Sequence, residues 1–161
     1  RQFFAYLRQQ LEGATISADL FGLSTVNRDD LGVGQIIEDA LLYFDYVCPM
    51  VYPSHYAPGF IGKQNPAEHP YEVVLHSMRS ARQRLEALGK QARARLRPWL
   101  QDFDLGALYT PERVLDQIRA TMEALGPGYT GFLLWNPRNR YTEEALAWLP
   151  PVRRFRIEAS D

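Results

Sequence analysis

The chain has 161 residues, a formal net charge of −1 at pH 7, 46% hydrophobic residues and 23% charged residues. This composition is that of a globular domain with a sizeable core, and it argues against disorder. The near-neutral charge predicts no nucleic-acid partner, and no apolar run approaches the roughly 18 residues of a membrane span. Cys48 is the only cysteine, so an internal disulfide is excluded. Its apolar surroundings predict a buried thiol rather than a nucleophile.

The first third of the chain alternates between helical and strand-like patterns. Apolar residues at helical spacing predict a helix over 1–12, which ends at Gly13. Residues 15–20 read as a strand, 36–44 as a second helix and 46–52 as a second strand. Because the chain opens without Met on a helical pattern, we expect it to be part of a longer protein.

The rest of the chain continues the same alternation after a long loop at 53–69, a length that is often functional. Two of the helices carry a proline at the position of a first helical residue, at Pro70 and Pro111. The expected elements are helices at 70–92, 110–125 and 142–149 and strands at 95–101 and 129–136.

A helix followed by four strand–helix units predicts an α/β fold with a parallel sheet, as a single domain over residues 1–161. Four such units are half of an eight-stranded barrel, although a small doubly wound sheet is the alternative. Polar groups at the end of every strand favour the barrel, because a doubly wound sheet concentrates them at one switch point. The sequence Gly32-Val33-Gly34 also lacks the spacing of a phosphate-binding loop.

Two aspartates are the candidate catalytic residues. Asp19 closes the first predicted strand on the face of Thr15 and Ser17, and Asp102 follows the third. Asp102 has the opposite parity to Gln101, so it reaches the barrel mouth only if its strand has already ended. Two carboxylates across a mouth could hydrolyse a glycosidic bond, one as acid and the other as nucleophile or base. A loop-capping aspartate is the alternative for each.

A second set of residues near the strand ends has the chemistry of a sugar site, in which aromatic rings stack on the sugar and amides bind its hydroxyls. These candidate substrate-binding residues are Tyr52, His55, Tyr56, Trp99, Gln101, Trp135, Asn136 and Asn139. Core packing is the alternative for the aromatic residues, and a satisfied loop histidine is the alternative for His55. His69 and His76 read as structural, and no paired Cys/His spacing supports a metal. Ser54 beside His55 does not predict a triad, because adjacent side chains seldom point at each other. No cofactor is expected.

Four segments together resemble a bacterial family described as "putative glycosyl hydrolase" domains, which is a TIM-barrel family distantly similar to α-amylase-type glycosidases. The segments that carry the resemblance are Ser17-Ala18-Asp19-Leu20-Phe21-Gly22, Pro49-Met50-Val51-Tyr52-Pro53-Ser54-His55-Tyr56, Arg97-Pro98-Trp99-Leu100-Gln101-Asp102-Phe103, and Leu133-Leu134-Trp135-Asn136 with Tyr141-Thr142. The resemblance covers nearly the whole chain, and the combination in this order is more specific than any single motif.

The resemblance implies that the strands are the fifth to eighth of a (β/α)8 barrel, so that the chain is a C-terminal half-barrel. The family's first half, with a strand of the Asp-Tyr-x-Arg-Phe-Pro type, has no counterpart, and one working carboxylate could lie there. The implied function is glycoside hydrolysis of a poly- or oligosaccharide, outside the cytoplasm. The alternatives are a non-catalytic carbohydrate-binding barrel and a structural half-barrel that self-associates. We expect a homodimer, or a need for the missing half, because a lone half exposes two sheet edges.

Overall fold

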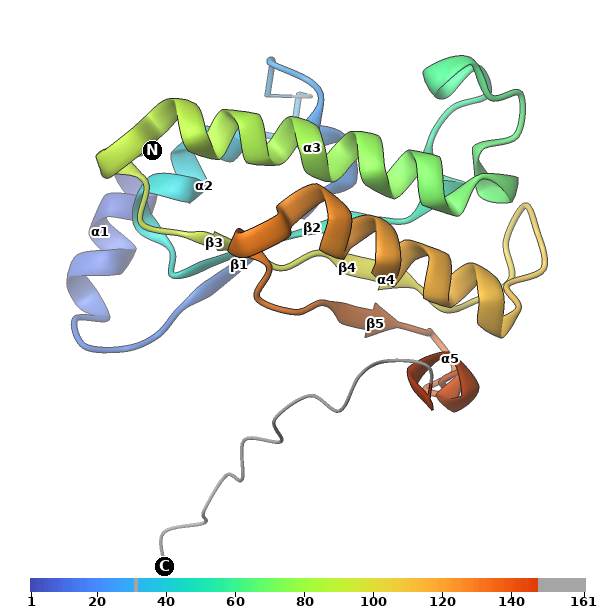
Figure 1. The fold of residues 1–161 in the computed structure, drawn as a ribbon. Helices are drawn as coiled ribbons and strands as arrows, with labels where there is room; N and C mark the ends of the chain where they lie inside the picture. The colour runs from blue at the N-terminus through green and yellow to red at the C-terminus, as the bar shows by residue number, and fades with distance from the viewer. Residues whose placement is uncertain (31, 148–161) are drawn as a thin grey trace, which may run out of the picture.

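The computed structural model describes residues 1–30 and 32–147 (Figure 1). The segment between the first predicted strand and the second predicted helix is therefore described except for residue 31. The predicted helix at 142–149 is described up to residue 147, and its last two residues lie outside the described part of the chain.

Within the described residues, five short strands form one sheet, and the sheet is parallel as the alternating pattern predicts. They are β1 (Ser17–Phe21), β2 (Tyr46–Val51), β3 (Arg95–Leu96), β4 (Trp99–Gln101) and β5 (Leu133–Trp135). The order across the sheet is β1-β2-β4-β5, with β3 also paired to β2. Since this order follows the chain without a reversal, the described sheet has no doubly wound switch point. The topology is compatible with a TIM-like fold.

The third predicted strand, 95–101, is interrupted in the structure at Pro98. Both of its parts pair with β2, since Tyr46 lies opposite Arg95 and Met50 lies opposite Trp99. Proline has no N–H to donate to the ladder, so the pairing lapses there and resumes one residue later. The Pro98 carbonyl still accepts a hydrogen bond from Leu133 N at 2.9 Å. The two parts therefore act as one strand in the order of the sheet.

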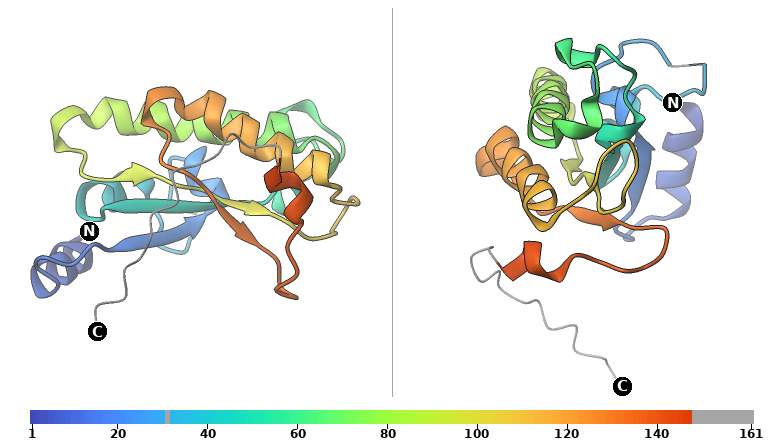
Figure 2. Two further views of the ribbon diagram at one scale, coloured as in Figure 1. Left: turned by 60° about the horizontal axis from the view of Figure 1, so that its bottom comes forward. Right: turned by 90° about the vertical axis from the view of Figure 1, so that its right-hand side faces the viewer.

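The helices are α1 (Gln2–Gln10), α2 (Ile37–Tyr43), α3 (Pro70–Leu88), α4 (Pro111–Leu125) and α5 (Glu143–Ala147). The two longest, α3 and α4, lie side by side on one face of the sheet in Figure 1 and in both views of Figure 2. Both begin with a proline at the first helical position, as expected from the fixed φ of that residue.

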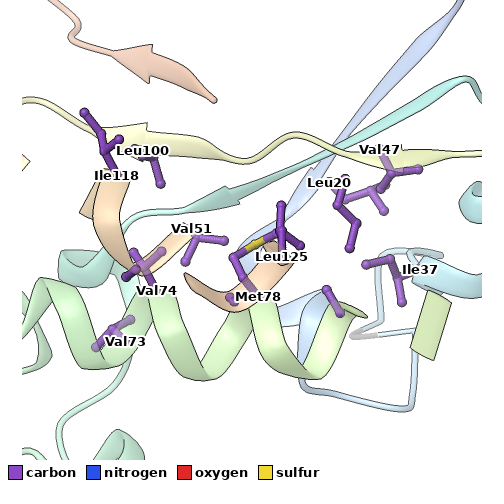
Figure 3. Close-up of a cluster of buried hydrophobic side chains, with 14 of the residues drawn as sticks. Leu20, Ile37, Val47, Val51, Val73, Val74, Met78, Leu100, Ile118 and Leu125 are labelled. Carbon is purple, nitrogen blue, oxygen red and sulfur yellow. The ribbon is translucent and has the colours of Figure 1, made fainter. Parts of the chain in front are cut away.

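The core lies between the sheet and these two helices (Figure 3). Side chains from alternate strand positions meet a stripe of apolar residues on the helices. Among the residues that Figure 3 labels, Leu20, Val47, Val51 and Leu100 come from the strands, and Ile37, Val73, Val74, Met78, Ile118 and Leu125 come from the helices. The alternation predicted for the first strand is confirmed, because Leu20 is buried while Asp19 and Phe21 are exposed.

Successive helices also hold one another through polar contacts. Arg84 on α3 is buried and donates to both carboxylate oxygens of Glu38 on α2, and to the carbonyls of Ser24 and Asn27 in the loop after β1. Burial is the largest single influence and raises the pKa of Glu38, but the hydrogen bonds and charge of Arg84, a backbone hydrogen bond and the charge of Arg28 together outweigh it, so the net pKa is lowered. This contact fixes the β1–α2 loop against α3.

The face of the sheet opposite α3 and α4 carries large exposed side chains. Phe21 is 51% exposed and Trp135 is 42% exposed, although both belong to strands. In an isolated parallel sheet this face is open, whereas in a barrel it lines the interior. We call it the open face. It carries the odd-numbered positions of β1, β3, β4 and β5 and the even-numbered positions of β2.

The long loop after β2 is folded into three short 3-10 helices, at Pro53–His55, Phe60–Gly62 and Pro66–Glu68. The Asn65 side chain anchors it by donating to the Gly106 carbonyl at 2.9 Å. Within the described part of the chain, no helix is long and apolar enough to cross a membrane.

Candidate functional site

Asp19 lies on the open face of β1, two residues before the end of the strand rather than at its end as expected. Its Oδ1 accepts a hydrogen bond of 2.9 Å from Nε1 of Trp99, two strands away across β2. The Trp99 indole in turn packs edge-on against Trp135, with 6.2 Å between ring centroids. One carboxylate and two indoles, all three predicted from sequence, are therefore brought together on the open face.

The negative charge of Asp19 acts on two neighbouring groups of β2 and the turn after it. Burial, reinforced by Asp19, raises the pKa of the Cys48 thiol to about 11. The same two causes, in the same order, raise the pKa of Tyr52. Cys48 is therefore a buried neutral thiol, and Tyr52 keeps its phenolic proton and can donate a hydrogen bond.

Asp102 is held differently from Asp19. Its backbone N donates to the Trp135 carbonyl at 3.0 Å, so the alternation of the sheet continues past Gln101. The carboxylate is buried, and its two oxygens accept hydrogen bonds from the backbone N of Thr142 at 2.8 Å and from its hydroxyl at 2.6 Å. Asp102 thus binds the start of α5 to the end of β4, and this contact matches the alternative of a loop-capping aspartate.

Gln101 is completely buried, and its hydrogen bonds are made within the protein. The side-chain Oε1 accepts from Ser54 N at 3.1 Å and from Ser54 Oγ at 2.9 Å, while Nε2 donates to the Phe103 carbonyl at 2.9 Å. Its backbone N–H and C=O exchange hydrogen bonds with the Gln117 side chain of α4. The structure therefore places Gln101 as the support of the loop after β2.

Asn136 and Asn139 both shape the loop between β5 and α5. The Asn136 side chain accepts from Arg138 N at 2.8 Å and donates to the Asp102 carbonyl. Asn139 adopts a left-handed backbone conformation with φ of 53°, which asparagine tolerates better than most residues. Its backbone N donates to the Asn136 carbonyl at 3.0 Å, so the two residues close one turn.

Three rings gather at the carboxyl end of β2 and β4. Tyr52 packs edge-on against His55 and Phe103, with centroid separations of 5.4 and 5.8 Å, and His55 meets Phe103 at 6.1 Å. Tyr52 is buried, whereas His55 is exposed. Phe103 was not among the predicted site residues, although it stands next to Asp102 in one of the motifs that carry the family resemblance.

Tyr56 belongs to the core side of this region. Its hydroxyl lies 3.0 Å from Ser77 Oγ on α3, its ring packs on Phe60, and burial raises its pKa to about 12. Tyr56 is therefore packed in the core, and it also borders a cavity of about 470 Å³ at the carboxyl ends of β1 and β2.

Two cavities flank the site. One of about 470 Å³ lies at the carboxyl ends of β1 and β2, where Phe21, Met50, Tyr52 and His55 contribute to its wall. The second, of about 330 Å³, is bordered by Asp102, Asn136 and the β5–α5 loop. Among residues 1–30 and 32–147, no group of three or more His, Cys, Asp or Glu side chains is placed to hold a metal ion.

The described residues form an α/β fold with a parallel sheet in chain order, which is compatible with a TIM-like fold, and the face away from α3 and α4 carries a carboxylate and two indoles. The model of the family described as "Putative glycosyl hydrolase domain" matches residues 1–141, so the chain belongs to this family. Searches of the curated proteins and of the solved structures gave no match.

Proposed function

We propose that the chain is the C-terminal half of a (β/α)8 barrel that hydrolyses glycosidic bonds in a poly- or oligosaccharide. The observation that carries this proposal is the Asp19 carboxylate, held by Trp99 beside the exposed Trp135 on the open face. Family membership supports the class of reaction. The arrangement offers a sugar ring an aromatic surface and, next to it, a group that can act on the glycosidic carbon or oxygen.

In this proposal Asp19 is the nucleophile or the general acid. Trp99 orients the carboxylate through Oδ1, and Oδ2 has no partner among the described residues, so that oxygen is available to a substrate. A partner carboxylate about 5 Å away would give retention of configuration, and one about 6.5–9.5 Å away would give inversion. Since Asp102 is bound by Thr142, we place that partner in the first half of the barrel.

The test is made on the complete barrel, with the proposed first half present, and compares Asp19→Asn with Asp116→Asn. Asp116 is a surface aspartate on α4 that pairs only with Arg119 among the described residues. The assays are hydrolysis of aryl α- and β-glycosides and of a panel of soluble polysaccharides, together with binding of the same polysaccharides by calorimetry. We expect Asp19→Asn to lower kcat about 100-fold or more while binding persists, because the amide can neither attack nor donate a proton. Asp116→Asn should remain within about twofold of the parent protein.

Trp135→Ala gives a second readout of the same site. Loss of the stacking surface should raise KM or weaken polysaccharide binding about fivefold. If Asp19→Asn hydrolyses its substrate at the parent rate, the catalytic role of Asp19 is wrong.

A non-catalytic carbohydrate-binding barrel is the second candidate, and one observation favours it. The two predicted carboxylates are not brought together, because Asp102 is buried at the start of α5 while Asp19 lies on the open face. A protein of this kind would bind a polysaccharide through Trp99 and Trp135 without turnover. Asp19→Asn would then leave binding nearly unchanged, and the panel of glycosides would show no hydrolysis by the parent protein.

The proposed half-barrel also has a consequence for assembly. β1 and β5 are the outer strands of the described sheet, and the exposed Phe21 and Trp135 lie on the face that a barrel would enclose. Unpaired edges and apolar surface of this kind favour pairing with another chain or with the missing half. We expect the 161-residue chain alone to form a homodimer in light scattering, and a monodisperse 18.5 kDa monomer would contradict the proposal.

A further inference from the structure

The side-chain amide of Gln101 has only one orientation that satisfies its neighbours. A backbone N–H, from Ser54, points at one end of the amide at 3.1 Å, and a backbone carbonyl, from Phe103, lies 2.9 Å from the other. The first group can only donate a hydrogen bond and the second can only accept one. The amide oxygen therefore faces Ser54, and the amide nitrogen faces Phe103.

This orientation fixes the direction of the Ser54 hydroxyl. Ser54 Oγ lies 2.9 Å from Oε1 of Gln101, which has no proton to give, so the hydroxyl must be the donor in this contact. A hydroxyl has a single proton, and this contact uses it. What Ser54 Oγ presents on its other side is a lone pair, and the group on that side is Nδ1 of His55 at 3.1 Å.

We propose that Ser54 is a positioning residue that holds His55 with a proton on Nδ1 and leaves Nε2 as its free ring nitrogen. A lone pair on Ser54 Oγ forms a hydrogen bond only if Nδ1 carries hydrogen. The Tyr52 and Phe103 rings pack edge-on against the imidazole and hold its plane. Nε2 has no partner among the described residues, and His55 lines the cavity of about 470 Å³ at the carboxyl ends of β1 and β2.

The free nitrogen determines what His55 can do. In the neutral ring Nε2 is a hydrogen-bond acceptor and a proton acceptor, so it can receive a hydroxyl proton from a ligand in the cavity. The polarity is opposite to that of a serine nucleophile, in which the serine donates its proton to the histidine. Ser54 is therefore a support for His55 and not a nucleophile. The identification of that ligand as a sugar rests on the proposed function, whereas the state of the ring does not.

The test is the ¹⁵N spectrum of the imidazole side chains in the full chain, at a pH where the rings are neutral. Protonated and unprotonated ring nitrogens have well-separated ¹⁵N shifts, and His55→Gln identifies the His55 signals among those of the three histidines. Free histidine favours the tautomer with hydrogen on Nε2, so the expected Nδ1–H form in the folded protein is a distinctive result. In Ser54→Ala the ratio of the two forms should move about tenfold toward Nε2–H, the effect of losing one hydrogen bond.

Ser54→Thr keeps the hydroxyl and should restore the Nδ1–H form, which separates the hydrogen bond from a general effect of substitution at this position. His76, which packs on Phe60, serves as the internal control and should keep its spectrum in both variants. A parent protein with His55 mainly in the Nε2–H form overturns the proposal, and so does an unchanged tautomer ratio in Ser54→Ala.

Activity measurements separate this proposal from the proposed function. If the tautomer ratio of His55 changes in Ser54→Ala as expected but no glycoside is hydrolysed or bound, the proposed function is wrong and the role of Ser54 stands. If glycosides are hydrolysed but the tautomer ratio of His55 is unchanged in Ser54→Ala, the role of Ser54 is wrong and the proposed function stands. Where both hold, Ser54→Ala should lower kcat about tenfold with Ser54→Thr close to the parent, because a misplaced proton removes the acceptor nitrogen.

Discussion

Replacing Gln117 by methionine should destabilise the protein severely, although the two side chains are similar in size. The β2–β4 pairing ends with Val51 opposite Leu100, so the next residue of β4, Gln101, has no strand partner on that side. Gln117 on α4 takes the place of a strand, since its Oε1 accepts from Gln101 N at 2.9 Å and its Nε2 donates to Gln101 O at 2.8 Å. Both residues are completely buried.

Methionine can form neither of these hydrogen bonds. Gln117→Met therefore leaves a buried N–H and a buried C=O without partners, and each costs about 1–3 kcal/mol. The expected loss is about 2–6 kcal/mol, which is a large part of the roughly 5–15 kcal/mol that stabilises a typical domain.

Urea unfolding measures this loss, with Gln83→Met as the matched control. Gln83 is an exposed glutamine on α3, and its substitution should change the free energy of unfolding by less than about 0.5 kcal/mol. If Gln117→Met costs less than about 1 kcal/mol with an unchanged m value, the backbone of Gln101 is not desolvated and the reasoning is refuted.

Three other perturbations test separate parts of the structure. Gly22→Ala should cost about 1–3 kcal/mol in unfolding experiments, because a Cβ there would overlap a main-chain oxygen of β2; an effect no larger than at an open-loop glycine would contradict this. The pKa of Asp45 is lowered to about 2, first by the Ile16 N–H and then by two arginines. Because the folded-state pKa lies below the unfolded value, the ionised Asp45 carboxylate stabilises the fold above about pH 4, and this stabilisation is lost as the pH falls through about 2. The free energy of unfolding of the parent should therefore fall about 1 kcal/mol more than that of Asp45→Asn across this interval. Cys48, with its pKa near 11, should react with iodoacetamide far more slowly than a free thiol at about pH 8, and Asp19→Asn should lower that pKa by removing a nearby negative charge.

The order and the parallel direction of the strands could be predicted because each strand alternates with an amphipathic helix. The residues at which the strands begin and end could not be predicted, because strand pairing depends on contacts with residues that are distant in the sequence. The first strand begins at Ser17 rather than residue 15, since Ile16 N is bound by the Asp45 carboxylate at 2.9 Å. The fourth predicted strand, which is β5 in the structure, begins at Leu133 rather than at residue 129. Gly131 has a φ of 100°, which is outside the extended region, so the strand begins only after it.

For the site, the sequence indicated residue types better than their hydrogen bonds. The contact of Asp19 with Trp99 joins residues 80 positions apart, and parity within each strand does not say which positions of two different strands share a face. The amides of Gln101 and Asn136 were expected to bind a ligand. In the structure Gln101 binds Ser54 of the loop after β2 and the Phe103 carbonyl, and Asn136 binds the N–H of Arg138 in its own loop. The Ser54–His55 contact was not expected, because the 3-10 turn that brings the two adjacent side chains together has no distinctive sequence pattern.

The continuation of the ladder past Gln101 determines where a second carboxylate must be sought. Because Asp102 N still pairs with the Trp135 carbonyl, alternation directs the Asp102 side chain away from the open face. The open-face positions of the described strands are Ser17, Asp19, Phe21, Tyr46, Cys48, Met50, Arg95, Trp99, Gln101, Leu133 and Trp135. Asp19 supplies the one carboxylate among them. A glycoside hydrolase built on Asp19 therefore takes its partner carboxylate from outside these strands, and in a closed barrel the facing strands are in position to provide it.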